Sequence, residues 1–186
     1  MIRPNGGVPA SLVLLLVFAV LAGCASPRGV TRVSVPERDA REAILADRQF
    51  SLENVPRGFS PQRAASFRIA AEGLRAMAAG RIQEAEDRLE RALSLDPRNP
   101  FCYLYLAELR SRGGDSEQAL VLLRQSEVHF HGHPYWLSEV FTRKGLCLEE
   151  LRSPEEARRC YHKALEYNPW NEAPRKRLER IAPSQG

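Results

Sequence analysis

Lysine is scarce in this chain. Of its 27 Lys and Arg residues, only Lys144, Lys163 and Lys176 are lysines. The positive charges alternate with negative ones, as in residues 83–93 (QEAEDRLERAL), and nowhere form a basic block. Alternation of this kind is typical of a solvated surface, whereas a nucleic-acid interface concentrates positive charge on one face or segment. We therefore expect no nucleic-acid partner.

Sequence motifs for catalysis are also missing. The chain has no Gly-rich phosphate loop, no arrangement of paired carboxylates and no serine-nucleophile motif. Cys160 and His162 are two residues apart, so on a helix they would point about 200° away from each other and make a poor nucleophile–base pair. We expect no catalytic residue, no cofactor and no enzymatic activity.

Only one long hydrophobic run is present. It covers residues 12–22 (LVLLLVFAVLA), and it is too short for a membrane-spanning helix, which needs about 20 apolar residues. Its length fits the apolar region of a signal peptide. The run ends in LAGC at 21–24, where the small residues Ala22 and Gly23 let the chain enter a peptidase site in an extended form, and Cys24 supplies a thiol at the cut.

LAGC resembles the lipobox of bacterial lipoproteins at all four positions. The resemblance implies that residues 1–23 are removed as a lipoprotein signal peptide and that Cys24 becomes the acylated first residue. Two or three acyl chains together anchor a protein stably in a membrane. Ala25, rather than Asp, follows the cysteine, which in this family implies an outer-membrane protein facing the periplasm. An ordinary signal peptide with an inert Cys24 is the alternative.

The residues after the lipobox divide into a tether and one domain. Residues 24–36 contain Ser, Pro and Gly without an amphipathic period, so we expect a flexible tether there. Residues 37–60 are expected to form an N-terminal helix and a loop. The composition, with 44% hydrophobic and 27% charged residues, is that of one soluble domain with a core.

A helix ending is written twice, 72 residues apart: ALSLDPRNP at 92–100 and ALEYNPWNE at 164–172. The small residues that precede the two endings keep the same spacing, since Gly73, Ala85 and Ala92 are matched by Gly145, Ala157 and Ala164. A middle copy lies 34 residues after the first, with Ala107, Ala119 and Ser126 at the small positions. Four extra residues near 131–136 separate the middle copy from the last. The chain therefore contains three phased copies.

A 34-residue period with these small positions resembles the tetratricopeptide repeat. The resemblance implies an all-α solenoid of helical hairpins over residues 61–182, with repeats at about 66–99, 100–133 and 138–171 and a capping helix at 171–182. The two helices of a hairpin cross closely only where side chains are nearly absent. The residues expected at these crossings are Gly73, Ala85, Ala92, Ala107, Ala119, Gly145, Ala157 and Ala164. A plain helical bundle is the alternative.

The resemblance also implies a concave groove lined by the first helix of each repeat, at repeat positions 2, 5, 9, 12 and 13. This groove would be apolar at its amino end, where Phe67, Leu74 and Met77 lie, and acidic at its carboxyl end, where Glu139, Glu149 and Glu150 lie. We expect the N-terminal helix (37–50) to bury the apolar half with Ile44 and Phe50, although an open apolar patch is the alternative. The candidate partner-binding residues are Phe101, Leu104, Glu108, Arg112, Leu146 and Glu149.

The sequence HFHGH at 129–133 raises the possibility of a metal site. His129, His131 and His133 follow each other at intervals of two across a helix end and a Gly turn, and no nearby Cys or carboxylate cluster completes four ligands. An inter-repeat loop with a histidine near a helix C-terminus is the preferred interpretation. We therefore expect no metal site.

Three cysteines remain besides Cys24: Cys102, Cys147 and Cys160. Cys147 and Cys160 would lie on the two helices of one repeat, and a periplasmic location permits a disulfide between them. Small buried packing residues are the preferred interpretation for all three. The disulfide state is left open.

Together these features predict a membrane-anchored adaptor of the bacterial cell envelope, which binds protein partners of an envelope assembly in its groove. Two alternatives stay open. One is a metal- or redox-handling lipoprotein that uses His129, His131 and His133. The other is a structural, homo-oligomeric module with its apolar face buried between copies.

Overall fold

A computed structural model describes residues 37–54 and 58–181 of the chain. The predicted signal peptide, Cys24 and the predicted tether lie outside the described residues. Within them every regular element is an α-helix, which confirms the all-α fold. None of the described helices combines the length and the apolar character needed to cross a membrane.

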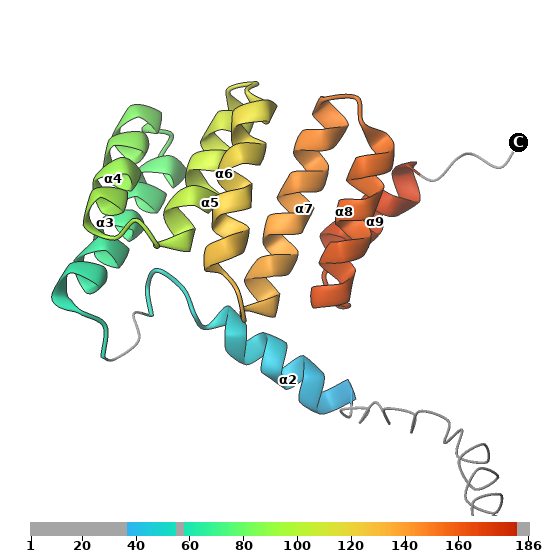
Figure 1. The fold of residues 1–186 in the computed structure, drawn as a ribbon, viewed down its shortest axis with the longest axis horizontal. Helices are drawn as coiled ribbons and strands as arrows, with labels where there is room; N and C mark the ends of the chain where they lie inside the picture. The colour runs from blue at the N-terminus through green and yellow to red at the C-terminus, as the bar shows by residue number, and fades with distance from the viewer. Residues whose placement is uncertain (1–36, 55–57, 182–186) are drawn as a thin grey trace, which may run out of the picture. The chain divides into compact units, whose positions relative to one another are not determined.

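The described helices, numbered α2 to α9, form three hairpins, with α2 before them and α9 after them in the chain (Figure 1). The hairpins pair α3 with α4, α5 with α6, and α7 with α8, and these pairs make the most extensive helix–helix contacts. Successive hairpins pack through α4 on α5 and α6 on α7, α9 packs on α8, and α2 packs on α7. The bounds are α2 (Glu37–Arg48), α3 (Pro61–Ala78), α4 (Ile82–Leu95), α5 (Pro100–Arg112), α6 (Ser116–His129), α7 (Pro134–Glu150), α8 (Pro154–Tyr167) and α9 (Glu172–Ile181).

Proline and polar caps start the helices. Pro61, Pro100, Pro134 and Pro154 each occupy the first turn of a helix, where a missing N–H costs no hydrogen bond. The Ser60 hydroxyl accepts the Arg63 N–H at 3.3 Å and so caps α3, as the Ser–Pro pair predicts. The helix starts of the first and third hairpins lie before 66 and 138, where the first and third repeats were expected to begin.

Residues with left-handed backbone conformation turn the chain within each hairpin. Gly80 has a φ of 74° between α3 and α4, and Gly114 has a φ of 85° between α5 and α6. At the equivalent turn between α7 and α8 the chain carries Arg152, with a φ of 59°. Glycine adopts this conformation without the steric cost that a Cβ brings, so the third turn is the strained one.

The eight small residues expected at the helix crossings are all buried. A Cβ added to Gly73 would lie 3.1 Å from Leu89 Cγ and 3.2 Å from the Ala85 carbonyl oxygen, both on the facing helix α4. A Cβ added to Gly145 would overlap the ring of Tyr161 on α8. The crossings are therefore as close as a hairpin with small residues permits.

The helix ending that the sequence repeats is a hydrogen-bonded connection to the next helix, from α4 to α5 and from α8 to α9. Asn99 Nδ2 donates to Ser66 Oγ at 2.9 Å, and Asn171 Nδ2 donates to Ser138 Oγ at the same distance. The Oδ1 atom of each asparagine also accepts the backbone N–H two residues later, at the start of the next helix. One side chain thus caps the next helix and ties it to the first helix of the preceding hairpin. This double role explains why Asn recurs after 72 residues.

The N-terminal helix lies elsewhere than expected. It was expected to bury the apolar half of the groove, at the first repeat, but α2 packs on α7 in the third hairpin. Only the residues that follow α2 reach the first two hairpins, where the Phe50 ring lies 6.0 Å from Phe67 on α3 and 5.4 Å from Phe101 on α5. The expectation was therefore wrong for the helix and right for Phe50 alone. The reason is that polar contacts with the start of α7 hold the carboxyl end of α2 there.

Candidate functional site

Two of the predicted partner-binding residues are in the core. Phe101 and Leu104 are fully buried, with exposed fractions of 0%. The Phe101 ring is surrounded by the rings of Phe50, Phe67, Phe130 and Trp136 at centroid distances of 4.8–5.7 Å. The assignment of Phe101 and Leu104 as partner-binding residues is therefore wrong, because no surface remains on them for a partner.

Glu149 is also committed within the fold. One of its carboxylate oxygens accepts the hydroxyl of Tyr161 on α8, and the other lies 3.3 Å from the Arg177 guanidinium on α9. Hydrogen bonding to Glu149 and burial together raise the pKa of Tyr161, with burial as the larger cause. Glu149 joins α7 to α8 and α9 and does not line the pocket described next, so its binding of a partner stays a prediction.

The other three predicted residues, Glu108, Arg112 and Leu146, meet at one pocket, called here the α5–α7 pocket, of about 210 Å³. Its apolar lining consists of Ala107, Leu123, Leu146 and Cys147. Its polar lining consists of Glu108, Ser111, Arg112 and Arg143. The pocket can accept one apolar side chain while the polar groups contact a flanking backbone or charge.

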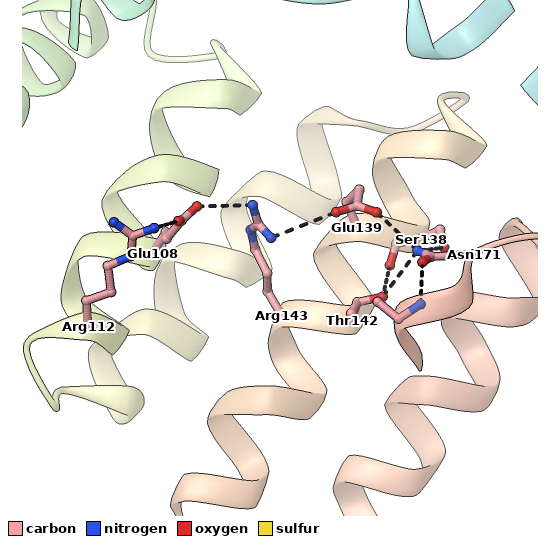
Figure 2. A network of polar contacts seen from close by, with 8 residues as sticks. Glu108, Arg112, Ser138, Glu139, Thr142, Arg143 and Asn171 are labelled. Atoms are coloured by element: carbon pink, nitrogen blue, oxygen red, sulfur yellow. Dashed lines mark hydrogen bonds and ion pairs between the residues drawn. The ribbon is translucent and has the colours of Figure 1, made fainter. Parts of the chain in front are cut away.

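A belt of polar contacts runs from this pocket across α7 (Figure 2). Arg112 pairs with Glu108 on the same helix, and the other oxygen of Glu108 accepts from Arg143 Nη2 at 3.0 Å. Arg143 also faces Glu139, 3.8 Å away, and Glu139 accepts from Asn171 Nδ2 at 3.1 Å. Two guanidinium groups thus share Glu108, and Arg143 Nε is buried without an acceptor among the described residues. Arg112 is exposed and makes one ion pair, so its guanidinium has donor capacity left for an oxygen-bearing ligand.

A second pocket, called here the α2–α7 pocket, lies beyond Glu139 and has a volume of about 290 Å³. Helix α2 supplies one side with Arg41, Ile44, Leu45 and Arg48. The rest comes from Tyr135 and Glu139 on α7, from Asn168, Trp170 and Asn171 between α8 and α9, and from Glu172 at the start of α9. Because Glu139 lines this pocket and contacts Arg143 of the first one, the two pockets border the same polar belt.

The titration of groups at the α5–α7 pocket gives no sign of a reactive nucleophile. Burial raises the pKa of the Cys147 thiol, so it stays protonated at neutral pH. The thiols of Cys102 and Cys160 have pKa values raised by burial as well. In the structure Cys102, Cys147 and Cys160 are free thiols.

The three histidines of HFHGH have different neighbours. His129 stacks on Tyr103 with a centroid distance of 5.7 Å, whereas His133 stacks on Phe50 at 4.3 Å and its Nδ1 lies 2.6 Å from Asp47 Oδ1. His131 is exposed. Among residues 37–54 and 58–181 no group of three or more His, Cys, Asp or Glu side chains is arranged to hold a metal ion.

Sequence reasoning missed Arg143, which joins the two pockets. Arg143 is at repeat position 6, which is not one of the five positions that the resemblance assigns to the groove. The signal that could have found it is the spacing of four between Glu139 and Arg143, which places opposite charges on one helix face.

Comparison with known families identifies the repeats. Sequence models of the tetratricopeptide repeat match residues 76–138 and 138–169. The chain carries tetratricopeptide repeats. Among curated proteins, none matches the chain.

Solved tetratricopeptide-repeat domains share the fold. The domain of Sgt2 from Aspergillus fumigatus is 27% identical, with a TM-score of 0.57 over 68% of this chain and 82% of that one. The domain of OM64 from Arabidopsis is 19% identical, with a TM-score of 0.59 over 64% and 96%. The second such domain of human RPAP3, in complex with the HSP70 peptide SGPTIEEVD, is 20% identical, with a TM-score of 0.55 over 62% and 97%.

Proposed function

We propose that this chain is a lipid-anchored adaptor that binds an extended peptide segment of a partner protein across α5 and α7. The observation that carries the proposal is the α5–α7 pocket, whose apolar floor is bordered by Glu108, Arg112 and Arg143. An apolar floor holds a peptide side chain, and the charged rim orients the peptide and selects its neighbours. The similar domain of human RPAP3 was solved in complex with a peptide, which supports this use of the fold.

The proposed lipid anchor on Cys24 would hold the adaptor at a membrane. The LAGC sequence at 21–24 supports acylation of Cys24 and a location on the outer membrane, facing the periplasm, with residues 24–36 as a tether. A membrane-held pocket raises the local concentration of any partner that is itself attached to the membrane. Recruitment within an envelope assembly, without reaction chemistry of the chain's own, is the proposed mechanism.

The binding site is tested with one variant and a matched control. Leu146 is half-buried in the pocket, whereas Leu151 is 37% exposed at the turn after α7, outside the pocket. Random dodecapeptides displayed on phage are selected on the wild-type protein, and the best peptide is synthesised for fluorescence anisotropy. Leu146→Glu should weaken binding at least about tenfold, because it places a charge on the apolar floor, and Leu151→Glu should not. Equal binding by both variants and wild type would place the site elsewhere, provided that circular dichroism shows intact folding.

The anchor is tested separately in a Gram-negative host. Labelled palmitate should be incorporated into the wild-type chain, and the protein should sediment with outer membranes. Cys24→Ala should lose both properties, because no thiol remains to carry the lipid. A wild-type protein without label, or one released from membranes like the variant, contradicts the anchoring proposal.

A further inference from the structure

Helix α2 lies outside the repeats, yet it forms one side of the α2–α7 pocket. We infer that α2 is part of the ligand site and that Arg41 and Arg48 bind a carboxylate of the same peptide that the α5–α7 pocket holds. This inference rests on the proposed function, since it concerns a second contact of that peptide.

Polar anchors fix α2 beside the pocket. Asp47, near the end of α2, accepts the Tyr135 N–H at 2.8 Å with one oxygen and lies 2.6 Å from His133 Nδ1 with the other. Two residues after α2, the Phe50 carbonyl accepts from Trp136 Nε1 at 2.6 Å. Ile44 is buried on the inner side of α2. The helix is therefore held by contacts at its carboxyl end, which keeps the side chains of its other turns next to α7.

The lining of the α2–α7 pocket carries two guanidinium groups and two carboxylates, and only the carboxylates have charged partners. Its two carboxylates have partners, because Glu139 contacts Arg143 and Asn171, and Glu172 lies 3.0 Å from Lys176. Arg41 and Arg48 are exposed, and neither forms an ion pair with another of the described residues. The Arg48 guanidinium lies 5.8 Å from the centre of the Tyr135 ring. Two cations without anions beside aromatic walls favour a carboxylate as the occupant.

The two pockets lie at a spacing that one peptide can bridge. Leu146 lines the first pocket, and Glu139 and Tyr135 line the second, seven and eleven residues earlier on α7. At a rise of about 1.5 Å per residue, these separations are about 10 to 16 Å along the helix. An extended chain covers them in about three to five residues. The ligand is thus an extended peptide with an apolar residue about three to five positions from a carboxylate.

The carboxylate has two sources, an internal Asp or Glu or the free C-terminus of a peptide. Dodecapeptides selected on the full chain are synthesised in three forms: unchanged, with the acidic residue replaced by its amide, and with an amidated C-terminus. Each form is titrated against wild type, Arg41→Gln/Arg48→Gln, and the control Arg91→Gln/Arg98→Gln. The control pair is exposed and also forms no ion pair with a described residue, but it lines neither pocket.

We expect Arg41→Gln/Arg48→Gln to bind the unchanged peptide about tenfold more weakly than the wild-type protein does. For the peptide form that lacks the critical carboxylate, the affinities of this variant and of wild type should agree within about twofold. The form that loses this sensitivity identifies the source of the carboxylate. Arg41→Lys/Arg48→Lys should retain most of the affinity, because the positive charge remains, and it guards against a folding defect of the glutamine variant.

The inference fails if the glutamine variant binds all three peptide forms as tightly as wild type does. It also fails if the variant's affinity for all three forms is reduced by the same factor. It also fails if the control pair of substitutions has the same effect, since the effect would then reflect net charge alone. These failures leave the proposed function intact as long as Leu146→Glu weakens binding at least about tenfold and Leu151→Glu does not. If no peptide is selected on the wild-type chain, both the proposed function and this inference fail.

Discussion

Asp47 caps a helix to which it does not belong: its Oδ2 atom accepts the backbone N–H of Tyr135, in the first turn of α7, at 2.8 Å. The residue that precedes α7, His133, makes no side-chain capping bond of its own. The first N–H groups of a helix have no partner within the helix, and a carboxylate also interacts favourably with the positive end of the helix dipole. The contact therefore stabilises α7 and attaches α2 at once.

Asp47→Ala should lower the free energy of unfolding by about 1–2 kcal/mol, because the cap and the His133 contact are lost together. It should also speed hydrogen exchange at the α2 amides, measured by mass spectrometry. Asp39→Ala is the matched control, since Asp39 is an exposed acid in the first turn of the same helix and should cost about 0.5 kcal/mol or less. Unchanged α2 protection in Asp47→Ala would show that other contacts hold the helix.

Arg152→Gly should stabilise the protein by about 0.5–1 kcal/mol in urea unfolding. The reason is that Arg152 has a φ of 59°, a conformation that costs a side chain energy and glycine almost none. Gly114→Ala, at the equivalent turn of the preceding hairpin with a φ of 85°, should destabilise by about 1 kcal/mol. A variant Arg152→Gly that unfolds at lower urea concentration than wild type would mean that the arginine side chain contributes more than its backbone costs.

Gly145→Ala should destabilise the protein by about 1 kcal/mol or more, although alanine favours helices. The added Cβ would overlap the Tyr161 ring, which the bond to Glu149 holds in place. Gly73→Ala should cost less, because the neighbours of its added Cβ, Leu89 Cγ and the Ala85 carbonyl oxygen among them, lie at 3.1–3.2 Å and need to shift by only a few tenths of an ångström. Thermal unfolding of the two variants in parallel ranks them; the reverse order would contradict the packing described here.

Stability should fall in alkaline solution between about pH 10 and pH 12, partly through Tyr105. Burial raises the pKa of this tyrosine from its usual value near 10 to about 12, while the neighbouring Arg143 acts in the opposite direction. Above pH 10 the unfolded chain releases the proton but the folded chain retains it, so unfolding is favoured as the pH rises through this window. Tyr105→Phe should remove about 1 kcal/mol of this loss. Urea unfolding of wild type and Tyr105→Phe at pH 9 and at pH 11 measures this difference. If the free energy of unfolding falls by the same amount in the two proteins, Tyr105 does not contribute to the alkaline loss.

Some residues of the candidate site could be predicted from the sequence, and others could not, because their exposure depends on contacts with distant parts of the chain. Glu108, Arg112 and Leu146 could be placed at a groove from repeat positions alone, because their direction follows from helix phase. Phe101 and Leu104 could not, since their burial depends on long-range packing: Phe50 is one of the rings against Phe101, and it reaches it only because α2 ends where it does. The α2–α7 pocket could not be predicted from the sequence either, because it forms only where α2 packs on α7.

The sequence by itself determined the helical hairpins, their number, and their close crossings, because small residues in phase, prolines at helix starts and glycines in turns act over a few residues or one repeat. It also contains the connections from α4 to α5 and from α8 to α9, which the recurring asparagine specifies. The tertiary structure alone decided where α2 lies and which groove residues keep an accessible surface. Those outcomes depend on contacts such as Asp47 with Tyr135, 88 residues apart, whose partners no local pattern identifies.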